Sequence, residues 1–191
     1  LIDDLLDVSR ITRGKLELRK GPVELADIVR NAADATRPLI NEAQHTITVC
    51  LPDKPLLLYA DANRLTQVLT NLISNAAKFS PPGGTVRIQI NREDPGVRIT
   101  VSDNGPGIPA EFCARIFQKF AQADASDSRA KSGTGLGLSI AKTITQKLGG
   151  RIGFDTAPGR GTSFYIILPM HGRTLDAKGP PELPNKVEET E

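Results

Sequence analysis

Hydrophobic residues along this chain of 191 residues recur with two spacings, one typical of helices and one typical of strands. Apolar positions three and four residues apart predict amphipathic helices, each with one face for a core. Asp61 is expected to cap one of them, and the Gly149-Gly150 pair is expected to end the last. The expected helices are residues 1–11, 25–44, 62–79, 111–116 and 136–148.

Alternation of apolar and polar residues predicts strands between these helices. In residues 97–103, the parity that turns three apolar side chains toward a core also turns Asp103 inward. Thr162 is inward by the same reasoning, so antiparallel pairing of the two strands would bring a carboxylate and a hydroxyl together. The expected strands are residues 46–51, 85–90, 97–103, 151–154 and 162–168, and residues 56–59 form a further apolar segment.

The length and the order of these elements predict one main domain with short flanking pieces. We expect the end of a helix in residues 1–20, with a hinge at Lys20-Gly21-Pro22, and the main domain in residues 21–170. Residues 171–191 lose the apolar pattern and are expected to be a linker or disordered tail. The apolar stripe of the first helix needs a neighbour, and both the main domain and a second copy of the chain are candidates.

Composition narrows the classes of partner. A net charge of +2, with basic residues scattered among acidic ones, argues against a nucleic-acid or anionic-membrane surface. No apolar run reaches the roughly 20 residues that span a bilayer, so we expect a cytoplasmic domain without membrane contact, although the full-length protein could be anchored elsewhere. Cys50 and Cys113 lack the spacing of a metal site.

Helix 62–79 is expected to carry polar chemistry on the side away from its apolar stripe. At about 100° per residue, Arg64, Asn71, Asn75 and Lys78 fall on one face. Amide oxygens beside a lysine suit Mg²⁺ held together with a phosphate, because Mg²⁺ prefers oxygen ligands and keeps several waters. A solvated surface of mixed polarity is the alternative.

Gly133, Gly135 and Gly137 leave the backbone bare where the last helix begins. Free N–H groups and the positive end of the helix dipole attract an anion there, which predicts a phosphate site. Glycines that merely allow close packing are the alternative.

Residues 121–131, just before these glycines, have no apolar period and are expected to be mobile. Their position favours a lid over the phosphates, in which Arg129 and Lys131 would meet the negative charge. A plain loop is the alternative.

Asp103 needs a partner, because an unpaired buried charge is costly. A backbone N–H in the following Asp-Asn-Gly turn is one candidate. The amino group of a ligand is the other, and Gly105 and Gly107 would let a flat ring approach the backbone.

A series of ordered motifs in these segments resembles the catalytic ATP-binding domain of sensor histidine kinases, a family shared with type II topoisomerase, heat-shock chaperone and mismatch-repair ATPases. The resemblance runs from Val23 to Pro169 and implies a two-layer α/β sandwich, with a mixed, mostly antiparallel sheet covered by helices on one face. The motifs are Asn71–Phe79, Asp103–Ile108, Phe117 with Phe120, Gly133–Leu138 and Gly161–Phe164.

This resemblance implies a role for individual residues. Asn75 would bind Mg²⁺, Lys78 a phosphate and Asp103 the adenine amino group, with Asn71, Asn75 and Lys78 as the catalytic residues. Ser132 departs from the pattern, because many relatives have glycine there. The residues implied to contact the nucleotide are Asn75, Lys78, Phe79, Asp103, Gly105, Gly107, Ile108, Phe120, Arg129, Lys131, Gly133, Thr134, Gly135, Leu136, Gly137, Leu138 and Thr162.

The implied activity is transfer of the γ-phosphoryl group of ATP, with Mg²⁺, to a histidine. That histidine would lie on an upstream dimerisation domain, of which residues 1–20 resemble the end. A homodimer and a response regulator or receiver domain are the implied partners. His45 and His171 lack the acceptor setting and are expected to be exposed structural residues.

A hydrolytic ATPase of the same fold and a nucleotide-binding module without transfer activity are the alternatives. Hydrolytic relatives have a glutamate where this chain has Asn71, and an amide is a poor general base.

Overall fold

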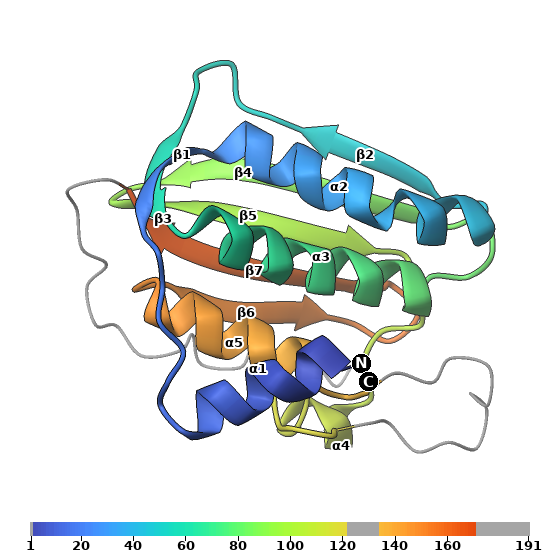
Figure 1. Cartoon of the computed structure of the whole chain (residues 1–191). Coiled ribbons are helices and arrows are strands. Elements are labelled where there is room, and N and C mark those ends of the chain that lie inside the picture. The colour runs from blue at the N-terminus through green and yellow to red at the C-terminus, as the bar shows by residue number, and fades with distance from the viewer. Residues whose placement is uncertain (1, 122–133, 171–191) are drawn as a thin grey trace, which may run out of the picture.

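The computed structural model describes residues 2–121 and 134–170. Its helices are α1 (Ile2–Thr12), α2 (Leu25–Glu42), α3 (Ala62–Phe79), α4 (Ala110–Cys113) and α5 (Gly137–Lys147). Its strands are β1 (Gly21–Glu24), β2 (Thr46–Cys50), β3 (Leu57–Ala60), β4 (Thr85–Glu93), β5 (Gly96–Asp103), β6 (Arg151–Thr156) and β7 (Thr162–Pro169). Figure 1 shows α2, α3 and α5 covering one face of a sheet, which confirms the expected two-layer α/β fold.

The main sheet has the strand order β2-β4-β5-β7-β6. The pair β2 and β4 is parallel, and the other neighbours are antiparallel. In the three central strands, alternate residues face the helices, as the sequence predicted. These residues are apolar, and the helices form the second layer that excludes water from them. These buried residues are Val86, Ile88, Ile90, Val97, Ile99, Val101, Phe164, Ile166 and Leu168.

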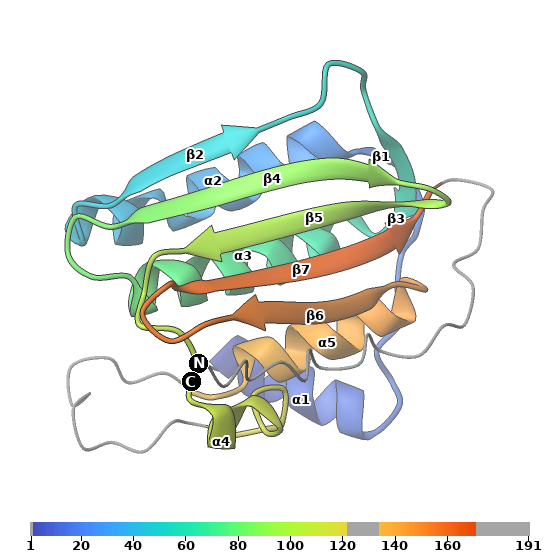
Figure 2. The same ribbon diagram turned by 180° about the vertical axis from the view of Figure 1, so that it is seen from behind.

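No described helix lies over the opposite face of the sheet (Figure 2). Thr85, Arg87 and Gln89 of β4 point outward on this face and are exposed. Tyr165 is nevertheless buried there, because the Arg98 guanidinium stacks 3.6 Å from the centre of its ring. Side chains within the sheet therefore shield the one large aromatic ring that this face carries among the described strands.

Helix α3 lies between α2 and α5 and packs against β4 and β5. Its N-terminus is capped as predicted, since the Asp61 carboxylate accepts a hydrogen bond from the backbone N–H of Arg64 at 3.1 Å. One face of the helix is entirely withdrawn from solvent, which fixes its rotation about its own axis. The buried residues are Leu65, Val68, Leu69, Leu72, Ile73, Ala76 and Ala77.

A second, two-stranded sheet pairs β1 with β3 in antiparallel fashion. Gly21 is opposite Ala60 and Pro22 is opposite Tyr59, so the expectation of a hinge at Lys20-Gly21-Pro22 is wrong for its last two residues. Pro22 fits here because β1 pairs on one side, and proline without an N–H is tolerated on such an edge. The link into α2 is therefore held by strand pairing.

His45 is buried, and the expectation that it is exposed is wrong. Gln44 has φ 55°, and the N–H of His45 bonds back to the carbonyl of Ile40 at 2.9 Å, so the end of α2 turns the chain inward. The buried ring then finds a polar partner, with Nε2 2.8 Å from the carbonyl oxygen of Ala77. His171 lies outside the described residues, as does the tail expected at 171–191.

Helix α1 packs against the main domain. Val8 and Ile11 contact the core, while Ile2, Leu5 and Leu6 stay exposed. The Asp7 carboxylate, whose side chain is 8% exposed, accepts two hydrogen bonds of 2.9 Å from Arg64 and one of 2.6 Å from Gln67. The main domain and a second copy of the chain were both considered as neighbours for the apolar stripe of this helix. The main domain therefore covers part of that stripe.

Replacing Asp7 with alanine is expected to release α1 from α3, because it leaves the half-buried Arg64 charge without its partner. A hydrogen bond to a charged group contributes about 1.5–3 kcal/mol, so hydrogen-exchange protection of residues 2–12 should fall by roughly tenfold or more. Asp4→Ala is the control, since Asp4 makes no ion pair with any described residue. Unchanged protection in the Asp7 variant would show that the ion pair does not hold the helix.

Candidate functional site

The predicted site residues that the structure describes lie where β5 ends and β7 begins, on the C-terminal half of α3, and at and before the start of α5. Asp103 pairs with Val86 at the start of β4, and the neighbouring pair Ser102 and Ser163 joins β5 to β7. The antiparallel pairing that was expected to bring Asp103 and Thr162 together is present. The backbone N–H of Thr162 donates to Asp103 Oδ1 at 3.2 Å.

Asp103 is held by backbone N–H groups. Its Oδ1 accepts from Gly105 at 2.8 Å as well as from Thr162, so the turn N–H considered as a partner is indeed one. Oδ2 accepts no hydrogen bond from a described residue. Burial raises the pKa of the carboxyl, while these two backbone bonds pull its pKa the other way. The site thus contains a half-buried carboxylate with one oxygen available to a ligand.

The glycines around Asp103 are required by close contacts between backbone segments. A Cβ at Gly161, where φ is +82°, would lie 2.0 Å from the Asp103 carbonyl oxygen. One at Gly107, where φ is +84°, would lie 2.4 Å from the carbonyl oxygen of Ala157. A Cβ at Gly105 would lie 2.6 Å from the Phe79 carbonyl oxygen. From the sequence, these glycines were expected to make room for a flat ring. The structure adds that backbone segments of the chain pack so closely here that no side chain fits at these positions.

Thr156 is a site residue that sequence reasoning missed. Its hydroxyl accepts a hydrogen bond from the N–H of Ile108 at 2.9 Å and donates to the carbonyl of Gly161 at 3.2 Å. It also lies 3.0 Å from the hydroxyl of Thr162, which is buried. The signal was available in part, because Thr156 closes the strand that precedes the Pro-Gly-Arg-Gly turn.

The polar face of α3 divides into two parts. Arg64 lies at its start and is taken up by Asp7, away from the predicted phosphate residues. Asn71 donates from Nδ2 to the carbonyl of Gly137 at 3.1 Å, which ties α3 to the start of α5. Asn75 and Lys78 are half-buried one and two turns further on, with the Lys78 ammonium 5.5 Å from the centre of the Phe79 ring.

The start of α5 is joined to the aromatic segment before it. The N–H of Phe120 donates to the carbonyl of Gly135 at 2.9 Å, and both residues have positive φ, 60° and 67°. Leu136 donates its N–H to the Thr134 hydroxyl at 3.2 Å. The first N–H groups of the helix, beginning at Gly137, have no acceptor within the helix, so they are available to an anion.

The two phenylalanines of the aromatic motif have different environments. Phe117 packs with ring centres 5.9 Å from Phe154 and 6.3 Å from Phe164, whereas Phe120 is 62% exposed. Leu136 is fully buried, Leu138 is half-buried, and Ile108 and Leu138 pack against the core. Arg129, Lys131 and Gly133, and the lid expected at 121–131 beyond Ala121, lie outside the described residues.

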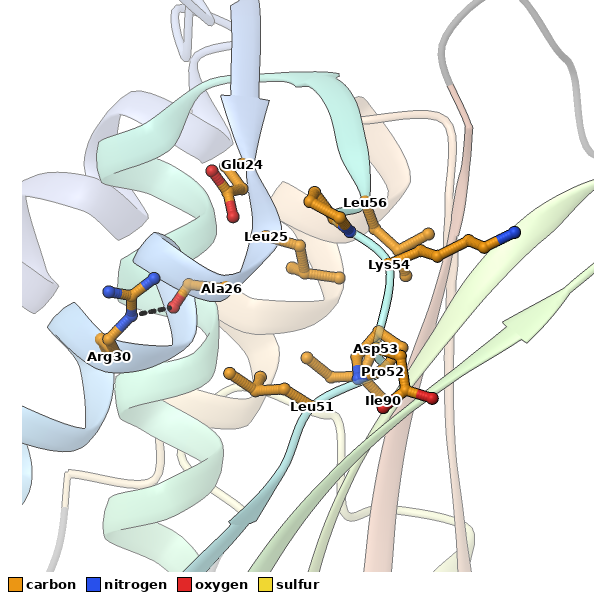
Figure 3. A pocket seen from close by; sticks show the side chains of 11 residues that line it. Glu24, Leu25, Ala26, Arg30, Leu51, Pro52, Asp53, Lys54, Leu56 and Ile90 are labelled. Carbon is orange, nitrogen blue, oxygen red and sulfur yellow. Dashed lines mark hydrogen bonds between the residues drawn. The ribbon is translucent and has the colours of Figure 1, made fainter.

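Two hollows in the surface lie away from Asp103. One of about 250 Å³ is lined by apolar and charged side chains at the opposite end of β4, where Arg30 bonds to the carbonyl of Ala26 at 3.3 Å (Figure 3). Another of about 420 Å³ lies between α1 and α5. Neither includes the predicted nucleotide residues on α3 or β5. In the described ranges, no cluster of three or more His, Cys, Asp or Glu side chains is arranged to hold a metal ion.

Residues 60–172 match the HATPase_c family of histidine kinase-, DNA gyrase B- and HSP90-like ATPases. The chain belongs to this family, and it is a catalytic domain of the sensor histidine kinase type, as the motifs suggested.

Similar proteins include sensor histidine kinases. The hybrid signal transduction histidine kinase D of Dictyostelium discoideum is 38% identical over 89% of this chain, and the sensor histidine kinase GacS of Pseudomonas protegens is 38% identical over 98%. The chain spans 11% and 21% of those proteins.

Solved structures of similar proteins agree with the fold. The mycobacterial sensor histidine kinase MprB has a TM-score of 0.67 and 30% identity, covering 79% of this chain and 97% of that one. Full-length ShkA in complex with AMPPNP has a TM-score of 0.75 and 32% identity, covering 88% of this chain and 35% of that one. Among the described residues, none of the helices combines the length and apolar character needed to cross a bilayer.

Gly161→Ala is expected to be strongly destabilising, because a Cβ would clash with the backbone of Asp103. Gly159→Ala is the matched control, since Gly159 has a similar φ of +70° but nothing within 4 Å of a Cβ. Left-handed backbone costs both variants about 1–2 kcal/mol, and overpacking should add about 1–3 kcal/mol at Gly161 alone. Denaturant unfolding measures the difference, and equal losses would show that the contact at Asp103 is not rigid.

Proposed function

We propose that this chain binds ATP and transfers its γ-phosphoryl group to a histidine on the dimerisation domain of a sensor histidine kinase. The observation that carries the proposal is that contacts link three groups. The turn after Asp103 packs at Gly105 against the carbonyl of Phe79, at the end of the helix that carries Asn75 and Lys78, and Asn71 of the same helix bonds to Gly137 at the start of α5. The match to the family and the AMPPNP complex of the similar protein ShkA support it.

Asp103 would select the base. Its Oδ2 is available to accept a hydrogen bond from the adenine amino group, while Oδ1 stays bonded to Gly105 and Thr162. Guanine offers a carbonyl oxygen in that position, and two acceptors repel each other, so GTP should bind far more weakly.

The phosphates would lie between α3 and the start of α5. Lys78 supplies a positive charge from one side, and the free N–H groups of the first turn of α5 supply donors from the other. Arg129 and Lys131 are proposed to add charge from the adjoining segment. Phe79 and Phe120, both exposed, are proposed to contact the nucleotide rather than the core.

Mg²⁺ is the proposed cofactor, with Asn75 as its protein ligand. The donor set fits, because Mg²⁺ takes one or two protein oxygens together with phosphate oxygens and water and needs no cage of carboxylates. When bound, Mg²⁺ neutralises charge on the transferring phosphoryl group. Asn75 is the residue of this chain that would hold it in register with Lys78.

Transfer to histidine is favoured over hydrolysis because the chain offers no base to activate water at the position where hydrolytic relatives have a carboxylate. Asn71 is there instead, and its amide nitrogen donates a hydrogen bond to the Gly137 carbonyl.

The partners that follow from this function are the phosphoacceptor domain of the same protein, a second copy in a homodimer, and a response regulator or receiver domain. Neither nucleic acid nor membrane is proposed to contact this domain, and its proposed location is the cytoplasm.

Asp103→Asn is expected to weaken ATP binding by about 1.5–3 kcal/mol, the contribution of a hydrogen bond to a charged group. Isothermal titration calorimetry with ATP measures the loss. Asp155→Asn is the matched control, because Asp155 is exposed and pairs with Arg98 on the other face of the sheet. Equal ATP affinity in the Asp103 variant would remove Asp103 from the base site.

The Asp103→Asn variant should not lose stability at neutral pH in the absence of nucleotide. Because burial raises the pKa of Asp103, the folded chain holds this proton more tightly than the unfolded chain does. The contribution of the group to the free energy of unfolding therefore falls as pH rises from the ordinary pKa of about 3.9 through the raised value. The amide of the Asp103→Asn variant carries no charge and removes that penalty, so urea unfolding at pH 7 should leave the variant within about 1 kcal/mol of the parent or above it.

Labelling and phosphate release with radiolabelled ATP distinguish a kinase from a hydrolase. With radiolabelled ATP, the chain alone should neither label itself nor release phosphate at an appreciable rate. Adding the phosphoacceptor domain of the same protein in dimeric form should give labelling of that domain, weakly because the two are not tethered. Asn75→Ala should abolish the labelling. Rapid phosphate release without any histidine-bearing partner would favour the hydrolase instead.

A further inference from the structure

The turn between β6 and β7 is attached to the turn after β5 by the side chain of Thr156. The hydroxyl oxygen of Thr156 has three neighbours within hydrogen-bond distance: the N–H of Ile108 at 2.9 Å, the carbonyl of Gly161 at 3.2 Å and the hydroxyl of Thr162 at 3.0 Å. The first belongs to the turn that begins with Asp103, and the other two lead into β7. One half-buried side chain therefore contacts both sides of the proposed base site.

Hydrogen-bond chemistry sets the direction of each contact. A hydroxyl has one proton to donate and two lone pairs. The Ile108 N–H can only donate, so it takes one lone pair, and the Gly161 carbonyl can only accept, so it takes the proton. All three contacts are then satisfied when the Thr162 hydroxyl donates to the second lone pair of Thr156. This arrangement fixes the proton of Thr162 toward Thr156.

The consequence for Thr162 is that it presents its ligand with lone pairs only. Asp103, bonded to the N–H of Thr162, presents a carboxylate oxygen beside it. Two neighbouring acceptors favour a base edge that brings an amino group, directly or through a water molecule, and they disfavour one that brings a carbonyl.

We infer that Thr156 is a positioning residue for base selection, acting through the Thr162 hydroxyl. This rests on the proposed function and adds to it the source of discrimination between 6-amino and 6-oxo purine nucleotides. Without the Thr156 oxygen, the Thr162 hydroxyl is free to rotate and donate to a base carbonyl.

Thr156 is one of several links between the two turns, so its effect can be measured in a folded chain. The N–H of Gly159 donates to the carbonyl of Pro106 at 2.8 Å, and Thr162 bonds to Asp103 through its backbone. Neither bond uses the Thr156 side chain, so we expect both to remain when its hydroxyl is replaced by a methyl group.

The test compares the affinities of the purified chain for ATP and for inosine triphosphate, which has a carbonyl in place of the 6-amino group. Thr156→Val should lower the ratio of ATP affinity to inosine triphosphate affinity by about fivefold or more, the effect of one neutral hydrogen bond. Thr156→Ser should keep this ratio within about twofold of the parent. In a Thr162→Val background, Thr156→Val should cause no further narrowing. Thr162→Val alone should narrow the preference as well, and this comparison does not depend on how well the Thr156 variant folds.

Equal weakening of both nucleotides by Thr156→Val, with their ratio unchanged, would assign Thr156 a purely structural role and overturn the inference. So would the same narrowing in the presence and absence of the Thr162 hydroxyl. A parent chain that binds neither nucleotide would overturn the proposed function itself, which is a different result.

Discussion

Burial of one face of α3 is the constraint on which the site depends. Leu65, Val68, Leu69, Leu72 and Ile73 are fully removed from solvent, so the helix cannot rotate without exposing several large side chains, at roughly 1.5–3 kcal/mol each. The positions of Asn75 and Lys78 follow from that fixed rotation. The bond from Asn71 to the Gly137 carbonyl then sets α5 relative to the same helix. Hydrophobic packing, rather than the polar residues themselves, therefore sets where the residues proposed to bind Mg²⁺ and phosphate lie.

The base end of the site is arranged by a different force. There, backbone segments approach so closely that no side chain fits between them, as at Gly161 beside Asp103. Two backbone N–H groups stabilise the carboxylate that burial would otherwise disfavour. The proposed nucleotide therefore meets two kinds of surface: one set by helix packing, and one set by turns that are themselves hydrogen-bonded to each other.

Sequence periodicity was enough to predict the helix that carries the site and the inward faces of the strands, whereas the two-layer arrangement was implied by the family resemblance. The bounds of α3 and the inward parity of β4, β5 and β7 came from local patterns, which report reliably on what a residue does within its own element. Other contacts between distant segments were missed, because local patterns do not report on them. The β1–β3 sheet, the Asp7–Arg64 ion pair and the burial of His45 each depend on residues far apart in the chain. Thr156 was missed because its three partners are brought together by two turns.

The one-sided sheet has a consequence for how this domain can vary over evolution. Along β4, residues that face the helices are buried in the core, while Thr85, Arg87 and Gln89 are exposed to water. Inward-facing positions of this strand should therefore resist substitution, because a change of volume in the core is costly. The outward-facing positions between them should accept substitution at little cost in stability. We therefore expect the exposed positions of the outer face to diverge readily between paralogues, except on β5 and β7 where Arg98 covers Tyr165.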